Sequence, residues 1–228
     1  MTTFTEVDVR CAVCGELSRV AELTSTSSFG PPDLDLRPQG PARWALEFGV
    51  QRCRTCSYCA PSIGSAPPGA SEVVRSVVYH GVSRGARLPR LARDYFCGAL
   101  VAEGAAKSPE SASRAFLKAA WACDDAGAAA QARICRERAA EMLVRAIENG
   151  ELEPPREVAF AILADLRRRA RHFEAALDAC AEAELALEEA AEDESNAATA
   201  TVVAFIRELV EAEDDESHNA AEAFSREE

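Results

Sequence analysis

Two pairs of cysteines constrain this chain more than any other feature of its sequence. The first pair is Cys11 and Cys14 in CAVCG, and the second is Cys53 and Cys56 in CRTCSYC. Zinc binds four thiolates tetrahedrally, and a Cys-x-x-Cys turn directs two sulfurs at one ion. Segments of alternating polarity, TEVDVRC and RWALEFGVQRC, precede the pairs and predict strands. We therefore expect a four-cysteine zinc site on a zinc-ribbon-like β module.

Cys59 extends the second pair to Cys-x-x-Cys-x-x-Cys, which is part of a bacterial ferredoxin sequence. The fourth cysteine of that sequence is missing, and an iron–sulfur cluster stays an alternative to zinc. A thioredoxin-like redox site is a further alternative, although no βαβ pattern surrounds either pair. We expect Cys59 to be a small buried side chain, with a replacement metal ligand as the other interpretation. The remaining cysteines lie on apolar helical stripes and are expected in the core: Cys97, Cys123, Cys135 and Cys180.

The cysteine count and the first residues indicate a compartment. Nine cysteines, an odd number, argue against a disulfide framework and for metal ligands and buried thiols in a reducing environment. The first residues have no basic start and no apolar run of the kind that a signal peptide needs. No stretch reaches the roughly 18 unbroken apolar residues of a membrane span. We expect a cytoplasmic protein without a membrane segment.

Helical periodicity begins at Leu88 and is interrupted by Ser108-Pro109, Asn149-Gly150 and Pro154-Pro155. Because the breaks are short, successive helices should be antiparallel neighbours. The segment ILADLRRRARHFEAALDACAEAE fits the tetratricopeptide pattern, with Ala164 and Ala176 as the small residues where paired helices touch. The predicted fold is mainly α, with a small N-terminal zinc-ribbon-like β module followed by tetratricopeptide-like antiparallel helical hairpins. A plain helical bundle is the alternative.

The chain divides into four predicted segments. Residues 1–65 form the zinc-ribbon-like module, 66–87 a linker with a short element, 88–213 the helical repeat domain and 214–228 an acidic disordered tail. In the linker we expect either a short helix from Ser71 to Gly81 or a strand. The net charge of −13 is concentrated at the C-terminal end, where residues 173–228 carry two basic and eighteen acidic side chains. Such an end repels nucleic-acid phosphates and anionic membranes.

The motifs favour a binding protein over an enzyme. Four cysteines leave no open position on a zinc ion, and the chain has no HExxH motif, nucleophile elbow or phosphate-binding glycine loop. We expect a protein or peptide partner on the helical repeats. The basic run LRRRAR at residues 166–171 either attracts an acidic peptide or forms a solvated helix face. Nucleic-acid association through the ribbon is the alternative function, carried by Trp44 and Phe48 beside Arg43 and Arg52.

Several of these segments together resemble the bacterial domain-of-unknown-function 2225 family. The resemblance lies in CAVCG, the long loop, CRTCSYCA and the helical segments AFLKAAWACDDAG and LADLRRRARHFEAAL, over roughly residues 8–185. Arg168 and Arg169 would be the arginine pair of the family. Ser57, Cys59 and Ala164 depart from it, standing where the family has Gly, Ala and Gly. The resemblance implies a zinc-binding N-terminal module, a tetratricopeptide-like helical domain and no established reaction.

Overall fold

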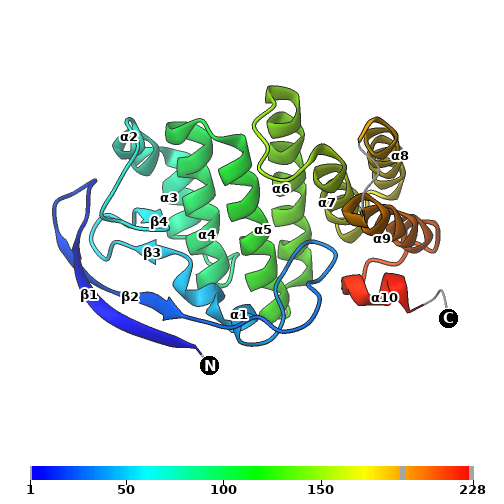
Figure 1. The fold of residues 1–228 in the computed structure, drawn as a ribbon. Helices are drawn as coiled ribbons and strands as arrows, with labels where there is room; N and C mark the ends of the chain where they lie inside the picture. Colours follow the sequence, from blue (N-terminus) through cyan, green and yellow to red (C-terminus); the bar gives the residue numbers. More distant parts are fainter. Residues whose placement is uncertain (1, 191–193, 226–228) are drawn as a thin grey trace.

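The computed structural model describes residues 2–190 and 194–225, and most of them are helical (Figure 1). Two small antiparallel hairpins lie in the N-terminal part. Strand β1 (Thr3–Arg10) pairs with β2 (Leu17–Ser25), and β3 (Gln51–Arg52) pairs with β4 (Cys59–Ala60). Each hairpin encloses one Cys-x-x-Cys turn. The predicted fold class, mainly α with a small N-terminal β part, is confirmed.

The strand predicted for residues 44–50 is wrong. This segment forms the short helix α1 (Pro41–Trp44) and the 3-10 helix η1 (Ala45–Phe48). Pro41 stands at the first helical position, where its fixed φ favours a helical turn. The carbonyl of Leu46 accepts a hydrogen bond from the Tyr95 hydroxyl at 2.6 Å, and the Phe48 ring stacks on Phe4 at 5.0 Å. Leu46 and Phe48 therefore contact neighbouring elements from a helical turn, whereas Trp44 is 73% exposed.

The helices follow one another side by side in chain order from α4 to α8, joined by short connections (Figure 1). Ser108 caps α5, with Pro109 at its first position, and Gly150 ends α6 in the left-handed conformation, as the sequence predicts. The bounds are α2 (Ala70–Arg75), α3 (Val77–Ser83), α4 (Arg90–Val101), its π-helical continuation η2 (Ala102–Ala106), α5 (Pro109–Asp125), α6 (Ala129–Asn149), α7 (Arg156–Arg169), α8 (Phe173–Glu189), α9 (Glu194–Glu211) and α10 (Ala220–Phe224). None of these helices is both long and apolar enough to cross a membrane.

Residues 66–87 hold two helices, α2 and α3, where the sequence predicts one short element. The helix break falls at Ser76, whose side chain caps α3 by accepting from the Tyr79 amide at 3.2 Å, and Gly81 lies inside α3. Val74 and Tyr79 are buried against the cysteine-containing turns. This segment is therefore part of the core beneath the hairpins.

Small side chains allow close helix packing in the main core. Ala164 of α7 and Ala176 of α8 are both fully buried, as expected for residues at the contact between paired helices. Without side chains beyond Cβ, two helix backbones approach closely and still exclude water. The four cysteines predicted to lie in the core are each 0% exposed: Cys97, Cys123, Cys135 and Cys180.

The loop between the two hairpins, residues 26–40, reaches the C-terminal end of the fold. The Leu34 amide donates to the carbonyl of His218 at 3.0 Å, and the Ala220 amide donates to the carbonyl of Pro32 at 2.9 Å. Asn219 and Glu222 form a capping box that begins α10. The disorder predicted from composition is therefore not seen in residues 214–225, because their backbone groups bind the loop. Residues 226–228 of that segment lie outside the described residues.

Two of the four arginines of LRRRAR, Arg168 and Arg169, bind acidic groups inside the protein. Arg168 is 0% exposed, pairs with Asp165 at 2.7 Å and donates to the carbonyl of Asp214 at 2.6 Å. Arg169 lies 3.3 Å from a carboxylate oxygen of Asp35 and 3.2 Å from one of Asp124. Neither arginine forms part of a solvated face or is free to bind an acidic peptide. Arg168 instead joins α7 to the segment that follows α9, and Arg169 joins it to the N-terminal loop and α5.

Candidate metal centre

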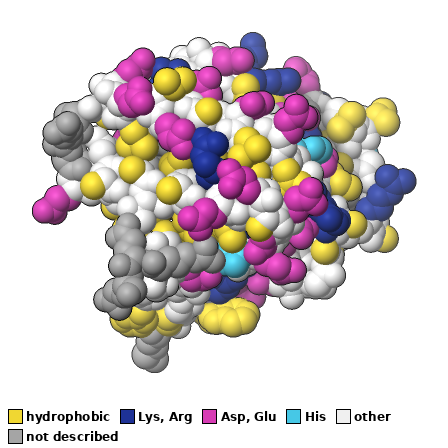
Figure 2. All heavy atoms as spheres, turned by 90° about the vertical axis from the view of Figure 1, so that its right-hand side faces the viewer, with side chains coloured by type: hydrophobic (Ala, Val, Ile, Leu, Met, Phe, Trp, Pro, Cys, Tyr) yellow, Lys and Arg dark blue, Asp and Glu magenta, His cyan; other side chains and the backbone are white. Residues whose placement is uncertain are grey.

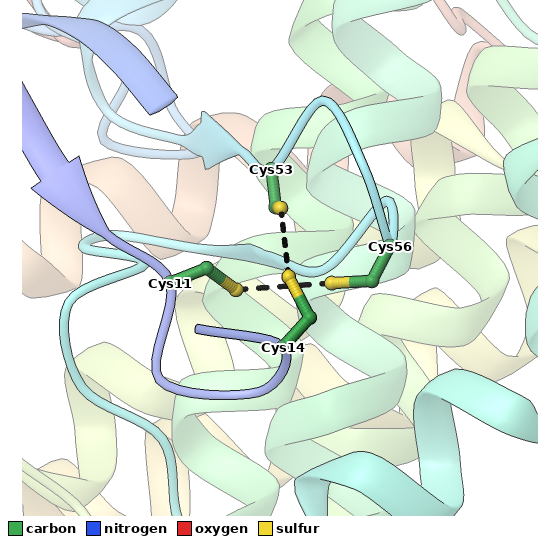
Figure 3. A group of neighbouring side chains, drawn as sticks. All are labelled: Cys11, Cys14, Cys53 and Cys56. Atoms are coloured by element: carbon green, nitrogen blue, oxygen red, sulfur yellow. Dashed lines mark hydrogen bonds between the residues drawn. The ribbon is translucent and has the colours of Figure 1, made fainter. Parts of the chain in front are cut away.

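The four cysteines predicted as metal ligands come together between the two hairpins (Figure 3). Their Sγ atoms all lie within 4.8 Å of one another. The Sγ atoms of Cys11 and Cys56 are 3.7 Å apart, and those of Cys14 and Cys53 are 3.6 Å apart. A tetrahedron with metal–sulfur bonds of 2.3 Å has edges of about 3.8 Å. The donor set and its size therefore fit one tetrahedral ion.

The first Cys-x-x-Cys turn joins β1 to β2. The Cys11 amide donates to the carbonyl of Glu16 at 2.9 Å, and the Gly15 amide donates to the carbonyl of Cys11 at 2.8 Å. Gly15 has a φ of 80° in the left-handed region, where glycine has no steric penalty. The glycine after the second cysteine therefore allows the chain to reverse and bring both sulfurs to one side.

The second turn repeats this hydrogen-bond pattern without a glycine. The Cys53 amide donates to the carbonyl of Tyr58 at 2.8 Å, and the Ser57 amide donates to the carbonyl of Cys53 at 3.0 Å. Ser57 has a φ of 64°, and its hydroxyl oxygen accepts from Nη2 of Arg52 at 2.9 Å. The hydrogen bond with Arg52 offsets part of the cost of placing serine in the left-handed region. The two turns are thus matched in backbone geometry although their sequences differ.

Hydrogen bonds lower the pKa of the Cys53 thiol. Burial acts to raise its pKa, but hydrogen bonds from the Cys56 and Thr55 amides and from the Cys14 side chain lower the pKa to about 6. The hydroxyl of Ser18 also donates to Cys53 Sγ at 3.8 Å. Burial raises the pKa of Cys56 and of Cys11. A metal ion would displace the protons from these two thiols, so its affinity should fall in acid.

Side chains from α3 and α4 hold the second turn in place. The hydroxyl of Tyr79 donates to the carbonyl of Ser57 at 2.8 Å and accepts from the Cys59 amide at 3.0 Å. Arg52 pairs with Asp94 of α4 at 2.8 Å. The supporting roles of Tyr79 and Asp94 have no signal in the sequence, because no spacing rule connects the turn to residues this far along the chain.

Cys59 lies outside the four-sulfur group. It is 0% exposed, and its thiol donates to the carbonyl of Ser57 at 3.4 Å. Its hydrogen bond with Cys97, together with burial, raises its pKa well above the ordinary value. Cys59 is therefore a buried thiol between the second turn and α4, as the sequence predicts.

The three histidines of the chain, which are the other common zinc ligands, do not join the group either. His172 lies 3.1 Å from a carboxylate oxygen of Glu137, and His218 lies between Asp214 at 3.0 Å and Glu222 at 2.7 Å. His80 is half-buried and lines a cavity beside the second turn. The metal-ligand group in the described residues consists of the four cysteines alone.

Comparisons with models of protein families, with curated proteins and with solved structures found no match to this chain. Its class is therefore defined by its own fold and site. It is a mainly helical protein with two antiparallel hairpins that bring four cysteines into a cluster able to hold a metal ion.

Proposed function

We propose that the chain is a zinc-binding protein in which the metal has a structural, non-enzymatic role. The observation that supports this proposal most strongly is the group of four sulfurs. The Sγ–Sγ distances within it are close to the edge length of a zinc–thiolate tetrahedron. Four thiolates fill the coordination sphere of zinc and leave no position for a substrate. Each pair comes from a different hairpin, so zinc would cross-link β1–β2 to β3–β4.

The site supports a single ion better than an iron–sulfur cluster. A cluster of several irons requires its ligands to stand further apart than the ligands of one ion, and Cys59 of the ferredoxin-like sequence is outside the group. Two hairpins with matched turns correspond to a zinc-ribbon-like module. This agrees with what the resemblance to the domain-of-unknown-function 2225 family implies, and we keep membership of that family as a proposal.

The helical part would serve as a surface for a protein or peptide partner. A cavity of about 660 Å³ lies along α6 where α7 meets α8. Its walls carry both charges, with Glu137, Glu141 and Glu148 beside Arg145 and Arg167. Such walls suit a peptide that itself carries both charges. Antiparallel tetratricopeptide-like hairpins often present a groove of this kind.

Metal analysis of two matched variants tests the zinc assignment. Purified wild-type protein should contain one zinc per chain. Cys56→Ala removes a ligand and should abolish zinc binding, whereas Cys59→Ala removes a buried thiol outside the group and should retain it. Loss of metal from both variants would show that Cys59 is a ligand. Iron in place of zinc would overturn the metal assignment.

Chelation distinguishes a structural from an accessory metal. Structural zinc contributes roughly 10 kcal/mol or more of apparent binding free energy. Removing it should unfold the hairpins and increase amide exchange in α2 and α3, whose buried side chains pack against the turns. Exchange in α7 and α8 should change little. Unchanged exchange at β1–β4 after complete metal removal would contradict the structural role.

Charge reversal in the groove tests the partner surface. Arg145 lines the groove with its side chain 58% exposed, and Arg156 lies outside the groove with a similar exposure of 55%. A partner captured by the wild-type protein should be lost with Arg145→Glu and retained with Arg156→Glu. Equal retention by both variants would place the partner elsewhere.

A further inference from the structure

A second cavity lies directly against the metal centre. Its volume is about 460 Å³, within the usual range for small-molecule sites. Both cysteine turns contribute to its wall through Cys14 and Cys56, and α2 and α3 form the opposite side. Its polar lining consists of cationic or imidazole groups and hydroxyls: Arg75, His80, Arg84, Thr55, Ser57 and Ser71. Beyond the cysteines, no acidic side chain is part of the wall.

The two arginines of this cavity differ from most arginines of the protein. Arg136, Arg168 and Arg169 are each bound to carboxylates of neighbouring elements. Arg75 and Arg84 form no ion pair or side-chain hydrogen bond with any described residue, and both are exposed at the cavity. Their guanidinium groups are therefore available to a ligand.

The local charge is positive although the whole chain is strongly acidic. Residues 54–93 carry six arginines and one acidic side chain, a surplus of five positive charges in a chain of net charge −13. A zinc ion with four thiolates contributes about two negative charges, so the surplus is reduced but not removed. Residues 173–228 hold eighteen of the 38 acidic side chains, and acidic side chains are spread over the face formed by the C-terminal helices (Figure 2). Anions would therefore be drawn to the end that holds the cavity.

We propose that this cavity binds a small ligand that carries a phosphate group, with the phosphoryl oxygens held by Arg75 and Arg84. A guanidinium group offers paired N–H donors that match the oxygens of a phosphate. The hydroxyls of Thr55 and Ser71 add neutral donors on two sides of the cavity.

The surface around the cavity favours a small ligand over a nucleic-acid strand. Val77 and Val78 of α3 follow Arg75 and are 88% and 65% exposed. They interrupt the basic surface with apolar side chains, whereas a phosphate backbone requires a continuous basic track. The proposal depends on the residues of the cavity and does not require that the helical groove bind a partner.

Calorimetric titration of the metal-loaded full chain tests the proposal. The probes are inorganic phosphate, pyrophosphate and adenosine 5′-monophosphate, each at constant ionic strength set with sodium chloride. The double variant Arg75→Gln/Arg84→Gln should weaken binding by about tenfold or more, because charge-assisted hydrogen bonds are lost. The matched control Arg87→Gln/Arg90→Gln removes two exposed arginines outside the cavity wall. Because solvent screens distant charges, it should change affinity by less than about threefold.

The metal content of each variant shows whether the metal centre is intact. If the double variant loses metal, the single variants Arg75→Gln and Arg84→Gln are titrated in its place. The proposal is overturned if no probe binds the wild-type chain in the millimolar range, or if both double variants lose affinity equally. A short single-stranded oligonucleotide is the last probe. If the oligonucleotide binds and inorganic phosphate does not displace it, the ligand is a polymer, and this result would also overturn the proposal.

Discussion

Replacing Asp35 by alanine tests the buried ion network that joins the N-terminal loop to the helices. Asp35 is 1% exposed and accepts from Nε1 of Trp121 at 2.8 Å and from Nη1 of Arg169 at 3.3 Å. Removing one partner of a buried ion pair costs about 3–5 kcal/mol, because the other charge stays buried. Arg169 keeps a second partner in Asp124 at 3.2 Å, so we expect about 3 kcal/mol.

Urea unfolding followed by tryptophan fluorescence measures this loss. Trp44 is 73% exposed and Trp121 only 8%, so the change in emission should come mainly from Trp121, the donor to Asp35. For a chain of this size, a loss of about 3 kcal/mol corresponds to a fall in Tm of about 6–12 °C.

Two further variants separate burial from charge. Asp35→Asn keeps an acceptor for Trp121 but removes the charge. Its free energy of unfolding should therefore lie between that of wild type and that of Asp35→Ala. Glu6→Ala removes the partner of Arg19 in an exposed pair of 2.8 Å, with side chains 64% and 56% exposed, and should cost less than about 1 kcal/mol. If Asp35→Ala costs no more than Glu6→Ala, burial does not set the strength of this network and the reasoning fails.

Three further predictions concern backbone conformation, titration and capping. Gly15→Ala should lower the free energy of unfolding by about 1–2 kcal/mol, because Gly15 has a φ of 80°. Gly81→Ala, inside α3 and equally free of contacts, should raise it by about 0.5–1 kcal/mol in urea titrations; equal effects would exclude a conformational cause. Burial acts to raise the pKa of Asp124, but the hydrogen bond and charge of Arg136 lower it overall. Its stabilising effect is therefore complete above the unfolded pKa of about 3.9 and is lost as the pH falls through the folded pKa. Asp124→Asn should reduce the pH dependence of stability below about pH 4, and an unchanged acid-unfolding profile would contradict this sign. Asn219→Ala should cost about 1 kcal/mol and increase amide exchange in α10, measured by mass spectrometry against α8 as the internal control.

The sequence was sufficient where local rules act. The spacing of each Cys-x-x-Cys pair, the polarity alternation before Cys11 and the caps at Ser108 and Gly150 depend on neighbours within a few residues. These features therefore predicted strand β1, the four-cysteine group, the start of α5 and the end of α6. Because the two Cys-x-x-Cys pairs already supply four ligands, the sequence also predicted that Cys59 lies outside the group.

Long-range contacts account for what the sequence analysis missed. The alternation from Trp44 to Val50 suggests a strand, yet Pro41 and the hydrogen bond from Tyr95 favour a helical turn. The supporting role of Tyr79 has no local signature. Acidic composition predicted a disordered end, but composition does not reveal that the loop around Leu34 supplies backbone partners for His218.

The pairing of the loop with the last helices has a consequence for folding during synthesis. The backbone of Pro32 and Leu34 binds residues that leave the ribosome after every long helix has been made. Contacts so distant in sequence raise the contact order, which slows folding. Until then, the backbone groups of Pro32 and Leu34 lack these partners, and the incomplete protein exposes the surface that residues 218–220 later cover. Emergence of residues 218–220 from the ribosome should therefore limit the rate at which the newly made chain becomes protease resistant.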